Sequence, residues 1–520
     1  HSDSMSRALY ATDASMYEIQ PVGVLLPRRL SDVQAALEVA AEFSIPVLPR
    51  GGGSSLAGQT VGEALVIDFS RHLDEILEIN PDEKYARVQP GLVLDRLNAA
   101  AAEHGLVVGP DPASSSRATL GGMMANNATG THSITYGNFI HHIRSAKGYL
   151  ADGTPFEFGP LSDEEWEERS RRSGREGEVY RRLDALLRQK EDTIRRETPE
   201  HWRRNSGYRP EHLLPNDDGA PRNPAELLCG SEGTLAVVTE LTFDLKELPE
   251  RTALGVCHFE TRQQALRAVT TILETDPAAI ELFDGMAVES ARESPGYRHR
   301  MSFVEGNPGG VLITEYFGET ESDLDARLDE LEATLEGESY AVGRHTDPAS
   351  IDNIWTVRKE GLGLIMSVKG DYKPWAFIED ASVPVEHLPQ YVDELSTLLD
   401  RTNTKAVFYA HASAGTLHVR PFINTKKKNE VDKMRDIARQ SMELVSKYGG
   451  AVSSEHGDGL ARSWLNEELL GEELYQTCVA IKKIFDPDNL LNPGKVVDAP
   501  EMTRNLRMGP DYETIPLIEE

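Results

Sequence analysis

Two histidines and a glutamate–histidine pair are the residues of this chain best suited to metal and proton chemistry. His411 and His418 flank a run of small residues in which Ala414–Gly415 suits a two-residue hairpin turn. Such a turn predicts that His411 lies directly opposite His418, and Tyr409 opposite Arg420. Directly opposed residues share one face of a hairpin, so the two imidazoles could bind one divalent ion.

Glu455 and His456 stand together in a second short segment, 453–459. With the two histidines of the hairpin, Glu455 completes a set of two imidazoles and one carboxylate, which catalytic zinc sites use while one position stays open. His456 is the candidate general base, because an imidazole accepts a proton near neutral pH. Spacing alone also fits an alternative, in which paired surface histidines stand beside an unrelated acidic turn and His456 is structural.

A glycine-rich loop between two predicted strands suggests a phosphate site. Gly51, Gly52 and Gly53 leave their backbone N–H groups unobstructed, and such a loop can form a concave nest for phosphate oxygens. The loop lacks the lysine of a Walker motif. It leads into a predicted strand at 64–69, not into the helix that follows a dinucleotide fingerprint. The loop therefore predicts a phosphate cradle of another kind, with a tight surface turn as the alternative.

Two further segments of small residues, 118–130 and 229–235, would let a large flat ligand lie close to the backbone. In order and content, the three segments resemble the FAD-binding domain of the vanillyl-alcohol oxidase/PCMH flavoprotein superfamily. Within it, the resemblance is to the D-lactate, glycolate and D-2-hydroxyglutarate dehydrogenase branch, including the flavin part of the FAD/iron–sulfur D-lactate dehydrogenases. The resemblance extends from about Tyr10 to Lys495, which is nearly the whole chain.

The elements that must hold these residues indicate an α+β fold. Strand–helix–strand patterns at 253–283 and 310–344 predict a ferredoxin-like sheet with its helices on one face. Together with the resemblance, they imply a PCMH-type FAD-binding domain (10–245), a substrate or cap domain (246–480), a C-terminal return to the FAD domain (481–500) and an extended tail (501–520).

Two segments of the first domain give local predictions. Ser31 and Gln34 form a capping-box pattern at the start of a helix. The buried stripe of that helix is predicted at Val33, Leu37 and Ala40. Residues 162–177 are dense in both signs of charge, which predicts a mobile surface insertion.

The resemblance implies that FAD is bound without a covalent bond, because Ser54 stands where members that tether flavin through this loop carry histidine. Small residues dominate the expected contacts, as they do where a backbone meets a ligand closely. The residues assigned to FAD are Pro49, Arg50, Gly51, Gly52, Gly53, Ser54, Ser55, Gly58, Gln59, Pro110, Asp111, Thr119, Gly121, Gly122, Asn126, Asn127, Gly130, Glu232, Gly233 and Asn492.

The activity that the resemblance implies is the FAD-dependent oxidation of a D-2-hydroxy acid, D-lactate first, to the 2-oxo acid. Arg358 and Lys373 match the carboxylate-binding pair of the family, and an arginine fork suits a carboxylate. Arg420 is a further candidate for the substrate pocket. In the family, the histidine at the position of His456 removes the hydroxyl proton while the C2 hydride passes to flavin N5.

The metal-dependent members of the family carry His-x6-His followed by Glu-His-Gly, which matches His411, His418 and Glu455. The match implies zinc or manganese at these residues, with iron as an alternative. One departure lies within the first motif, where 414–416 reads Ala-Gly-Thr and the family often reads Asp-Gly-Asn. The hairpin survives this change, but hydrogen bonds around the ligands would differ.

Reduced flavin must pass its electrons on, and the sequence contains no iron–sulfur, haem or nicotinamide motif. Residues 492–495 and the tail 502–520 resemble the junction at which longer bacterial enzymes continue from the flavin unit into an iron–sulfur module. This resemblance implies that the acceptor is an iron–sulfur module or subunit, and neither oxygen nor NAD. Two rival functions are a flavin-dependent transferase resembling alkylglycerone-phosphate synthase and a noncatalytic phosphate- or metal-binding module.

Composition argues against several kinds of partner. The net charge of −31 over 520 residues disfavours nucleic acid and anionic membrane surfaces. Three cysteines far apart in the chain disfavour a disulfide framework. The sequence shows neither an apolar run long enough for a transmembrane helix nor a signal-peptide pattern. We therefore expect a cytoplasmic protein, or one bound peripherally at the inner face of the membrane.

Overall fold

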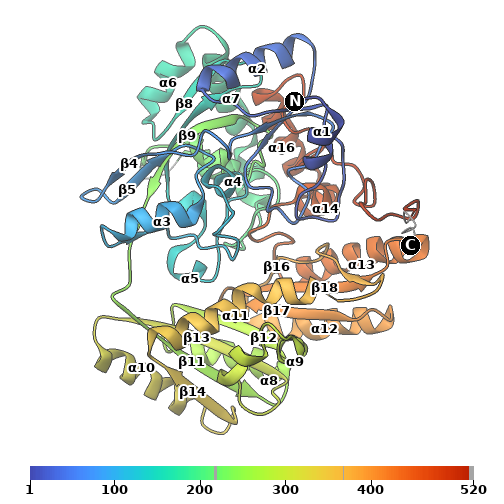
Figure 1. The fold of residues 1–520 in the computed structure, drawn as a ribbon. Coiled ribbons are helices and arrows are strands. Elements are labelled where there is room, and N and C mark those ends of the chain that lie inside the picture. Colours follow the sequence, from blue (N-terminus) through green and yellow to red (C-terminus); the bar gives the residue numbers. More distant parts are fainter. Residues whose placement is uncertain (216–218, 367, 514–520) are drawn as a thin grey trace.

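The chain folds into two lobes in the computed structural model (Figure 1). The described residues are 1–215, 219–366 and 368–513. The N-terminal domain forms the upper lobe of this view and includes the last helix, α16 (Glu472–Phe485). The second domain forms the lower lobe, from β11 (Arg251–Phe259) to α13 (Lys428–Lys447). Helices and sheets occur in both lobes, so the predicted α+β fold is confirmed.

The N-terminal domain contains a small parallel sheet and a larger antiparallel sheet. The parallel sheet has the order β1–β3–β2, with β1 (Gly23–Leu25), β2 (Val47–Arg50) and β3 (Leu65–Asp68). The antiparallel sheet has the order β4–β5–β9–β7–β8, with β4 (Ile76–Asn80), β5 (Tyr85–Val88), β7 (Ile143–Tyr149), β8 (Pro155–Phe158) and β9 (Val237–Asp244). The helices of this domain include α2 (Leu30–Glu42), α3 (Leu94–Ala102), α4 (Leu120–Ala125), α5 (Ser133–Tyr136), α6 (Asp163–Arg171) and α7 (Arg175–Glu197).

The predicted Ser31–Gln34 capping box is wrong. Helix α2 begins at Leu30, and the Asp32 carboxylate accepts the backbone N–H groups of Arg28 and Arg29 at 2.9 and 3.0 Å. An acidic side chain in the first turn satisfies these N–H groups, so the hydroxyl of the preceding serine is not needed. The predicted buried stripe is confirmed at Val33, Leu37 and Ala40.

The predicted mobile insertion at 162–177 is also wrong, because most of it forms helix α6. The Ser162 hydroxyl accepts the N–H of Glu165, and the Glu165 carboxylate accepts the N–H of Ser162, which completes a capping box. Trp166 is 1% exposed and packs edge-on against Tyr180 with ring centroids 5.0 Å apart. One buried tryptophan therefore fixes a helix whose other faces carry the charges.

The second domain contains one eight-stranded sheet. Its first strands have the order β14–β11–β13–β12 and pair antiparallel, as in a β-α-β-β-α-β unit, so the ferredoxin-like prediction is confirmed. The hairpin β17–β18 extends this sheet beyond β12, and short strands complete it along β18. The elements are α8 (Arg262–Leu273), β12 (Ala279–Asp284), β13 (Gly310–Gly318), α10 (Glu321–Thr334), β14 (Ala341–His345), β15 (Lys373–Pro374), β16 (Ala381–Ser382), β17 (Ala406–His411) and β18 (Thr416–Ile423).

Helices cover both faces of this sheet, whereas one covered face was predicted. The connecting helices α8 and α10 share a core with α12 (Leu388–Arg401) and α13. The opposite face packs against α9 (Gly285–Glu293) and α11 (Pro348–Met366). These two helices lie outside the strand–helix–strand units that the sequence pattern revealed. Among the described residues, no helix combines the length and apolar character that a membrane span requires.

The chain returns to the N-terminal domain after the second domain. Helix α16 packs into the N-terminal core beside α7, and Leu491 forms a parallel bridge with Val47. The return therefore begins before residue 481. The predicted extended tail is packed in part, since Met502 is fully buried and its carbonyl oxygen accepts the Tyr17 hydroxyl at 2.9 Å. Residues 514–520 of that tail lie outside the described residues.

One histidine joins the two domains. His132, just before α5, lies 2.7 Å from Asp111 Oδ2 through Nδ1 and 2.6 Å from Glu315 Oε2 of β13 through Nε2. Its ring stacks on Phe317 with centroids 5.3 Å apart. Burial opposes protonation, but the two carboxylates outweigh it and raise the pKa of His132 well above 6.5. The protonated ring can donate to both carboxylates at once, which links the N-terminal domain to the sheet of the second domain.

We expect His132→Gln to lower the free energy of unfolding in mildly acidic solution by about 1.5–3 kcal/mol, the contribution of a hydrogen bond to a charged group. Because the folded pKa is raised, this contribution is fully present below the unfolded pKa of 6.5. It is lost as pH rises through the folded pKa. Calorimetric unfolding of wild type and variant across this pH range measures the difference.

His104→Gln, at an exposed histidine of the same domain, is the control and should change little at any pH. A stability difference for His132→Gln that stays constant into alkaline solution would contradict the ionic link.

Candidate active site

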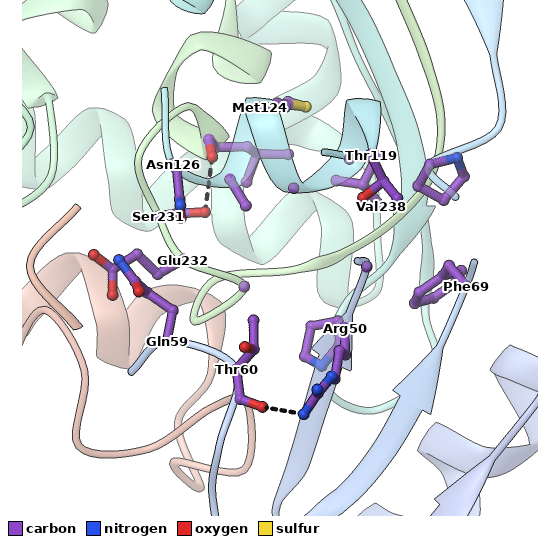
Figure 2. Close-up of a pocket in the computed structure, with 18 of the residues that line it drawn as sticks. Arg50, Gln59, Thr60, Phe69, Thr119, Met124, Asn126, Ser231, Glu232 and Val238 are labelled. Carbon is purple, nitrogen blue, oxygen red and sulfur yellow. Dashed lines mark hydrogen bonds between the residues drawn. The ribbon is translucent and has the colours of Figure 1, made fainter. Parts of the chain in front are cut away.

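A cavity that is partly open to solvent lies where the glycine-rich loop meets α4 and the loop before β9 (Figure 2). It has about 700 Å³ of empty space, part of which is open to solvent. The predicted residues that line it are Pro49, Arg50, Gly51, Ser55, Gln59, Thr119, Gly121, Gly122, Asn126, Glu232 and Gly233. Three segments that are far apart in the sequence therefore converge on one cavity.

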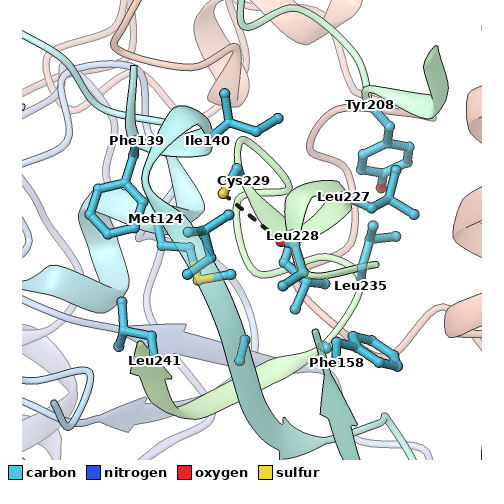
Figure 3. Close-up of a cluster of buried hydrophobic side chains, with 14 of the residues drawn as sticks. Met124, Phe139, Ile140, Phe158, Tyr208, Leu227, Leu228, Cys229, Leu235 and Leu241 are labelled. Carbon is cyan, nitrogen blue, oxygen red and sulfur yellow. Dashed lines mark hydrogen bonds between the residues drawn. The ribbon is translucent and has the colours of Figure 1, made fainter. Parts of the chain in front are cut away.

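A hydrophobic core supports this cavity (Figure 3). Met124 belongs to both, because it lines the cavity and packs within the core that also contains Phe139 and Leu241. Phe69 and Val238 line the cavity as well. The sequence gives no signal for these single apolar residues, since they belong to no motif.

Close backbone packing explains the glycines in the cavity. A Cβ on Gly51 would lie 2.0 Å from Thr119 Oγ1, and one on Gly121 would lie 2.5 Å from Pro90 Cβ. Thr119 Oγ1 and Gln59 Oε1 are buried without a hydrogen-bond partner among the described residues. Unpaired buried oxygens in a largely apolar cavity fit a bound molecule that supplies hydrogen-bonding groups.

Two of the predicted FAD-binding residues, Arg50 and Asn492, hold the backbone around the cavity by hydrogen bonds. The Arg50 guanidinium donates to the carbonyl oxygens of Tyr10, Thr12 and Thr60. Asn492 Nδ2 donates to the carbonyl oxygens of Gln59 at 3.0 Å and Glu232 at 2.8 Å. The C-terminal return therefore holds two lining segments in fixed positions.

The remaining predicted contacts lie outside this cavity, at Gly52, Gly53, Ser54, Gly58, Pro110, Asp111, Asn127, Gly130 and Asn492. Asp111 pairs with His132 at the domain boundary. The Asn127 side chain accepts the N–H of Ile140 and donates to Asn205, both at 2.8 Å. Its amide therefore ties together loops of the N-terminal domain.

The hairpin β17–β18 has a different register from the one predicted. His411 pairs with Thr416, and Tyr409 pairs with His418, because a longer connection with a 3₁₀ turn at 412–414 replaces the two-residue turn. The predicted pairs are wrong, but the shift is by two residues and keeps both histidines on one face. Their ring centroids lie 5.0 Å apart at an interplanar angle of 85°. Tyr409 stacks on His418 at 4.8 Å.

Three imidazoles converge on one carboxylate oxygen. Glu455 Oε1 lies 3.2 Å from His411 Nε2, 3.2 Å from His418 Nε2 and 3.5 Å from His456 Nε2. Ligand atoms bound to zinc at 2.0–2.1 Å in a tetrahedron stand roughly 3.3 Å apart, so these separations fit a metal site. Ligand atoms of Asp380, His418, Glu455 and His456 also lie within 4.8 Å of one another.

Asp380 fixes the backbone that carries Glu455 and His456. Its buried carboxylate accepts the N–H groups of Ser454 at 3.0 Å, Glu455 at 3.0 Å and His456 at 2.8 Å. The hydroxyls of Ser453 and Ser454 donate to the same carboxylate. Successive hydrogen bonds to one charged group set the direction in which both functional side chains leave the backbone.

Glu379 is a fully buried carboxylate behind two of the imidazoles. It lies 3.5 Å from His418 Nδ1, 3.3 Å from His456 Nδ1 and 2.5 Å from Arg420 Nη2. Burial opposes its ionisation, but Arg420 and the two histidines outweigh burial and hold the pKa of Glu379 well below its ordinary value. An ionised Glu379 orients both rings so that Nε2 of each faces Glu455.

Glu281 orients the third imidazole, that of His411, from its Nδ1 side. It lies opposite His411 in the β12–β17 ladder, with Oε1 2.6 Å from His411 Nδ1 and Oε2 2.5 Å from Arg358 Nη2. Burial alone would raise the pKa of Glu281, but Arg358 and His411 lower it. Glu455 has its own arginine, because Arg203 Nη2 lies 2.8 Å from Oε2.

The imidazoles of His418 and His456 differ in how readily they hold a proton. Burial opposes protonation of His418, yet Glu379 and Glu455 raise its pKa to about 9. A metal ion would compete with that proton for the ring nitrogen. Burial lowers the pKa of His456, so its ring stays neutral and able to accept a proton.

The predicted carboxylate-binding residues do not all join this cluster. The Arg358 guanidinium lies over the Tyr409 ring at 5.2 Å. Arg420 pairs with Val407 in the ladder, and its Nε donates to the Tyr409 hydroxyl at 3.2 Å. Lys373 lies in β15, where its Nζ donates to the carbonyl oxygen of residue 368. Among the described residues, no hydrogen bond or ion pair joins Lys373 to the cluster.

The sequence interpretation missed four residues of the cluster: Arg203, Glu281, Glu379 and Asp380. Glu281 and Glu379 each interrupt an apolar run, Ala-Ile-Glu-Leu-Phe at 279–283 and Ala-Phe-Ile-Glu at 376–379. A carboxylate inside a predicted buried segment requires a partner and is therefore a usable signal. Arg203 lies among polar residues and gives no such signal.

The segment that carries Glu455 and His456 lies beside the cavity. Gln59 and Glu232 line the cavity and also contact the segment that follows Glu455. Gln59 Nε2 donates to the carbonyl oxygen of His456, and Glu232 accepts the N–H of Asp458, both at 2.5 Å. A molecule in the cavity would therefore contact side chains that also hold the backbone of His456 and Asp458.

Each lobe matches a known domain family. Residues 21–159 match the family described as FAD binding domain. Residues 248–496 match the family described as FAD linked oxidases, C-terminal domain. The first match contains the glycine-rich loop and α4, and the second contains the imidazole cluster.

Curated relatives match along nearly the whole chain. The D-2-hydroxyglutarate dehydrogenase of Escherichia coli (strain K12) is 33% identical over 515 residues, which cover 95% of this chain and 50% of the relative. The D-lactate dehydrogenase of Archaeoglobus fulgidus is 29% identical over 476 residues, which cover 91% of each chain. Glycolate oxidase subunit GlcD of E. coli (strain K12) is 26% identical, covering 95% of this chain and 87% of the relative. The chain spans about half the length of the D-2-hydroxyglutarate dehydrogenases it matches.

Solved structures share the fold. An alkyldihydroxyacetonephosphate synthase is 17% identical with a TM-score of 0.62, covering 95% of this chain and 82% of that one. p-Cresol methylhydroxylase with substrate bound is 13% identical with a TM-score of 0.66, covering 95% and 93%. The predicted PCMH-type fold of the first domain is confirmed.

We expect Gly51→Ala to weaken FAD binding by at least about tenfold, equivalent to about 1.4 kcal/mol. The new Cβ would need the space now held by Thr119 Oγ1, 2.0 Å away, and would displace the loop from the cavity. Titration of FAD-stripped protein, followed by flavin fluorescence, measures the affinity. Gly159→Ala is the control, since its Cβ would meet Ser145 Cβ at an ordinary 3.5 Å. Equal FAD affinity of wild type and Gly51→Ala would show that this loop does not border the cofactor.

Proposed function

The chain belongs to the vanillyl-alcohol oxidase/PCMH superfamily of FAD-linked oxidases, and on this basis we propose that it is an FAD-dependent dehydrogenase of D-2-hydroxy acids. The observation that carries the proposal is the convergence of three imidazoles on Glu455 Oε1 beside the cavity. D-Lactate, the substrate expected from the sequence, and D-2-hydroxyglutarate, named by the relatives, are the substrates to compare.

Two features of the cavity fit FAD. The glycines that line the cavity allow a ligand to approach the backbone closely, and the side-chain oxygens of Thr119 and Gln59 lack hydrogen-bond partners within the described part of the chain, partners that FAD could supply. Bound FAD supplies the two-electron oxidant. We propose that it is held without a covalent bond, since the serine at position 54 cannot tether it as histidine does. The residues around the cavity would then exclude water from the bound cofactor.

A divalent ion, zinc or manganese with iron as an alternative, fits His411, His418 and Glu455 and supplies a Lewis acid for the substrate hydroxyl when bound. Glu281 lies 2.6 Å from His411 Nδ1 and Glu379 lies 3.5 Å from His418 Nδ1, so the Nε2 atoms of both rings face the ion site. The donor set of two imidazoles and one carboxylate is suited to such ions.

His456 is the proposed general base. Its Nε2 faces the cluster and its Nδ1 faces Glu379 at 3.3 Å, so Nε2 takes the hydroxyl proton while Glu379 stabilises the resulting imidazolium. Arg358 is proposed to hold the substrate carboxylate, sharing its guanidinium with Glu281. Lys373 and Arg420 are proposed as further carboxylate contacts, and for Lys373 this requires a different side-chain position.

The electrons are proposed to leave for an acceptor outside the described chain, an iron–sulfur module or subunit. The three cysteines, Cys229, Cys257 and Cys478, are all buried and far apart in the sequence, which does not suit a cluster site. The transferase alternative shares the flavin fold and predicts no net reduction of flavin by hydroxy acids.

Anaerobic mixing with single hydroxy acids tests the proposal. We expect D-lactate or D-2-hydroxyglutarate to bleach the flavin at least about 100-fold faster than L-lactate, because the site discriminates by fixed polar contacts. Glycolate serves as the achiral comparison. Chelator treatment that leaves FAD bound should slow bleaching by a similar factor. Reoxidation by an indophenol dye should be fast, and reoxidation by oxygen or NAD slow.

Two outcomes would contradict the proposed metal-assisted dehydrogenase activity. Flavin that no 2-hydroxy acid bleaches would favour the transferase. Bleaching that survives metal removal, with removal checked by elemental analysis, would take the ion out of the reaction.

Replacement of the base gives a separate prediction. His456→Asn should lower the rate of flavin reduction by roughly 10²–10⁴-fold, the usual contribution of a general base, while substrate affinity changes less. Stopped-flow reduction at increasing substrate concentration separates the two effects. His387→Asn, at a histidine that contacts Tyr448 of the second domain, is the matched control. A change confined to substrate affinity would remove His456 from the base role.

A further inference from the structure

Gln59 lies between the cavity and residues 455–459, which we call the catalytic loop. Its side chain is 3% exposed and lines the cavity, and Figure 2 places it beside Glu232. Nε2 donates to the carbonyl oxygen of His456 at 2.5 Å. Because a carbonyl oxygen only accepts hydrogen bonds, the amide nitrogen must face His456 and Oε1 must face another group.

The Oε1 atom of Gln59 is buried and has no hydrogen-bond partner among the described residues. A buried acceptor requires a donor, and the cavity fits FAD. The flavin offers the isoalloxazine N3–H and the ribityl hydroxyls as donors. The two ends of one amide can therefore serve different partners, the cofactor at Oε1 and the catalytic loop at Nε2.

The backbone of His456 is held from both domains. Its N–H donates to Asp380 of the second domain at 2.8 Å, and its carbonyl oxygen accepts from Gln59 of the N-terminal domain. Glu232 holds the next part of the loop by accepting the N–H groups of Asp458 and Gly459. The loop also fits closely, since a Cβ on Gly457 would lie 2.6 Å from both Gln59 Nε2 and Glu232 Oε1.

We propose that Gln59 is a positioning residue through which bound FAD holds His456 in place. Occupancy of the cavity fixes Oε1, and the same rigid amide then fixes the carbonyl oxygen of His456. The consequence for catalysis rests on the proposed function, but the coupling between cavity and loop does not. His456 stays anchored to Asp380 in every case, so the effect is confined to the side of the loop that faces the N-terminal domain.

Amide hydrogen exchange tests the coupling without any turnover. In wild type, saturating FAD should slow exchange in the catalytic loop by at least about tenfold. In Gln59→Met, which keeps the length of the side chain but offers neither group, saturating FAD should leave exchange as fast as in FAD-free wild type. Saturation removes any difference in FAD affinity from the comparison. Gln34→Glu on α2 is the control and should behave as wild type.

A second variant tests the donor directly. Gln59→Glu should lose the coupling when its carboxyl is ionised and regain it as pH falls, because a protonated carboxyl donates to the His456 carbonyl oxygen again. If 2-hydroxy acids reduce the wild-type flavin, both variants should reduce it about 10–100-fold more slowly with little change in KM.

The outcomes are separable. FAD protection of the loop that persists in Gln59→Met, or no recovery of Gln59→Glu at low pH, would overturn the role of Gln59. Failure of every hydroxy acid to reduce wild-type flavin would overturn the proposed function, while the exchange result would still decide the coupling.

Discussion

The Asp380 carboxylate is the group on which the geometry of the site depends. It collects three successive N–H groups of the 454–456 segment while its own residue adopts a left-handed backbone conformation with φ of +77°. Aspartate tolerates that conformation better than most residues. The positions of Glu455 and His456 are therefore set by backbone hydrogen bonds, before any imidazole or ligand contacts their side chains.

Charge balance around the imidazoles follows a repeated pattern. Three buried carboxylates each have one arginine: Glu455 with Arg203, Glu281 with Arg358, and Glu379 with Arg420. Breaking a buried pair by removing one partner is destabilising by about 3–5 kcal/mol. The arginines that would bind substrate are thus also the counter-ions that keep these carboxylates in the interior, so stability and function cannot be varied independently at these positions.

The sequence predicts those parts of the site that depend on local patterns, such as the hairpin that carries His411 and His418. The predicted direct opposition of His411 and His418 in the hairpin puts both on one face, and the register error of two residues leaves that face unchanged. The same reasoning could not find the turn, because the longer connection depends on tertiary contacts of Gly415, whose Cβ would lie 1.9 Å from the Val383 carbonyl oxygen. Glu281 and Glu379 were missed because their partners lie far away in sequence. The helix at 163–171 was missed because its charges obscured one anchoring tryptophan.

The C-terminal return has a consequence for how this chain is made. Leu474, Ile481 and Phe485 of α16 belong to the hydrophobic core of the N-terminal domain. That domain leaves the ribosome first, yet its core stays incomplete until the entire second domain has been synthesised. Its apolar surface is exposed to solvent or to chaperones throughout that interval. A nonsense mutation just before α16 would accordingly act as a folding defect of the N-terminal domain described here, although that domain precedes the mutation by more than 200 residues.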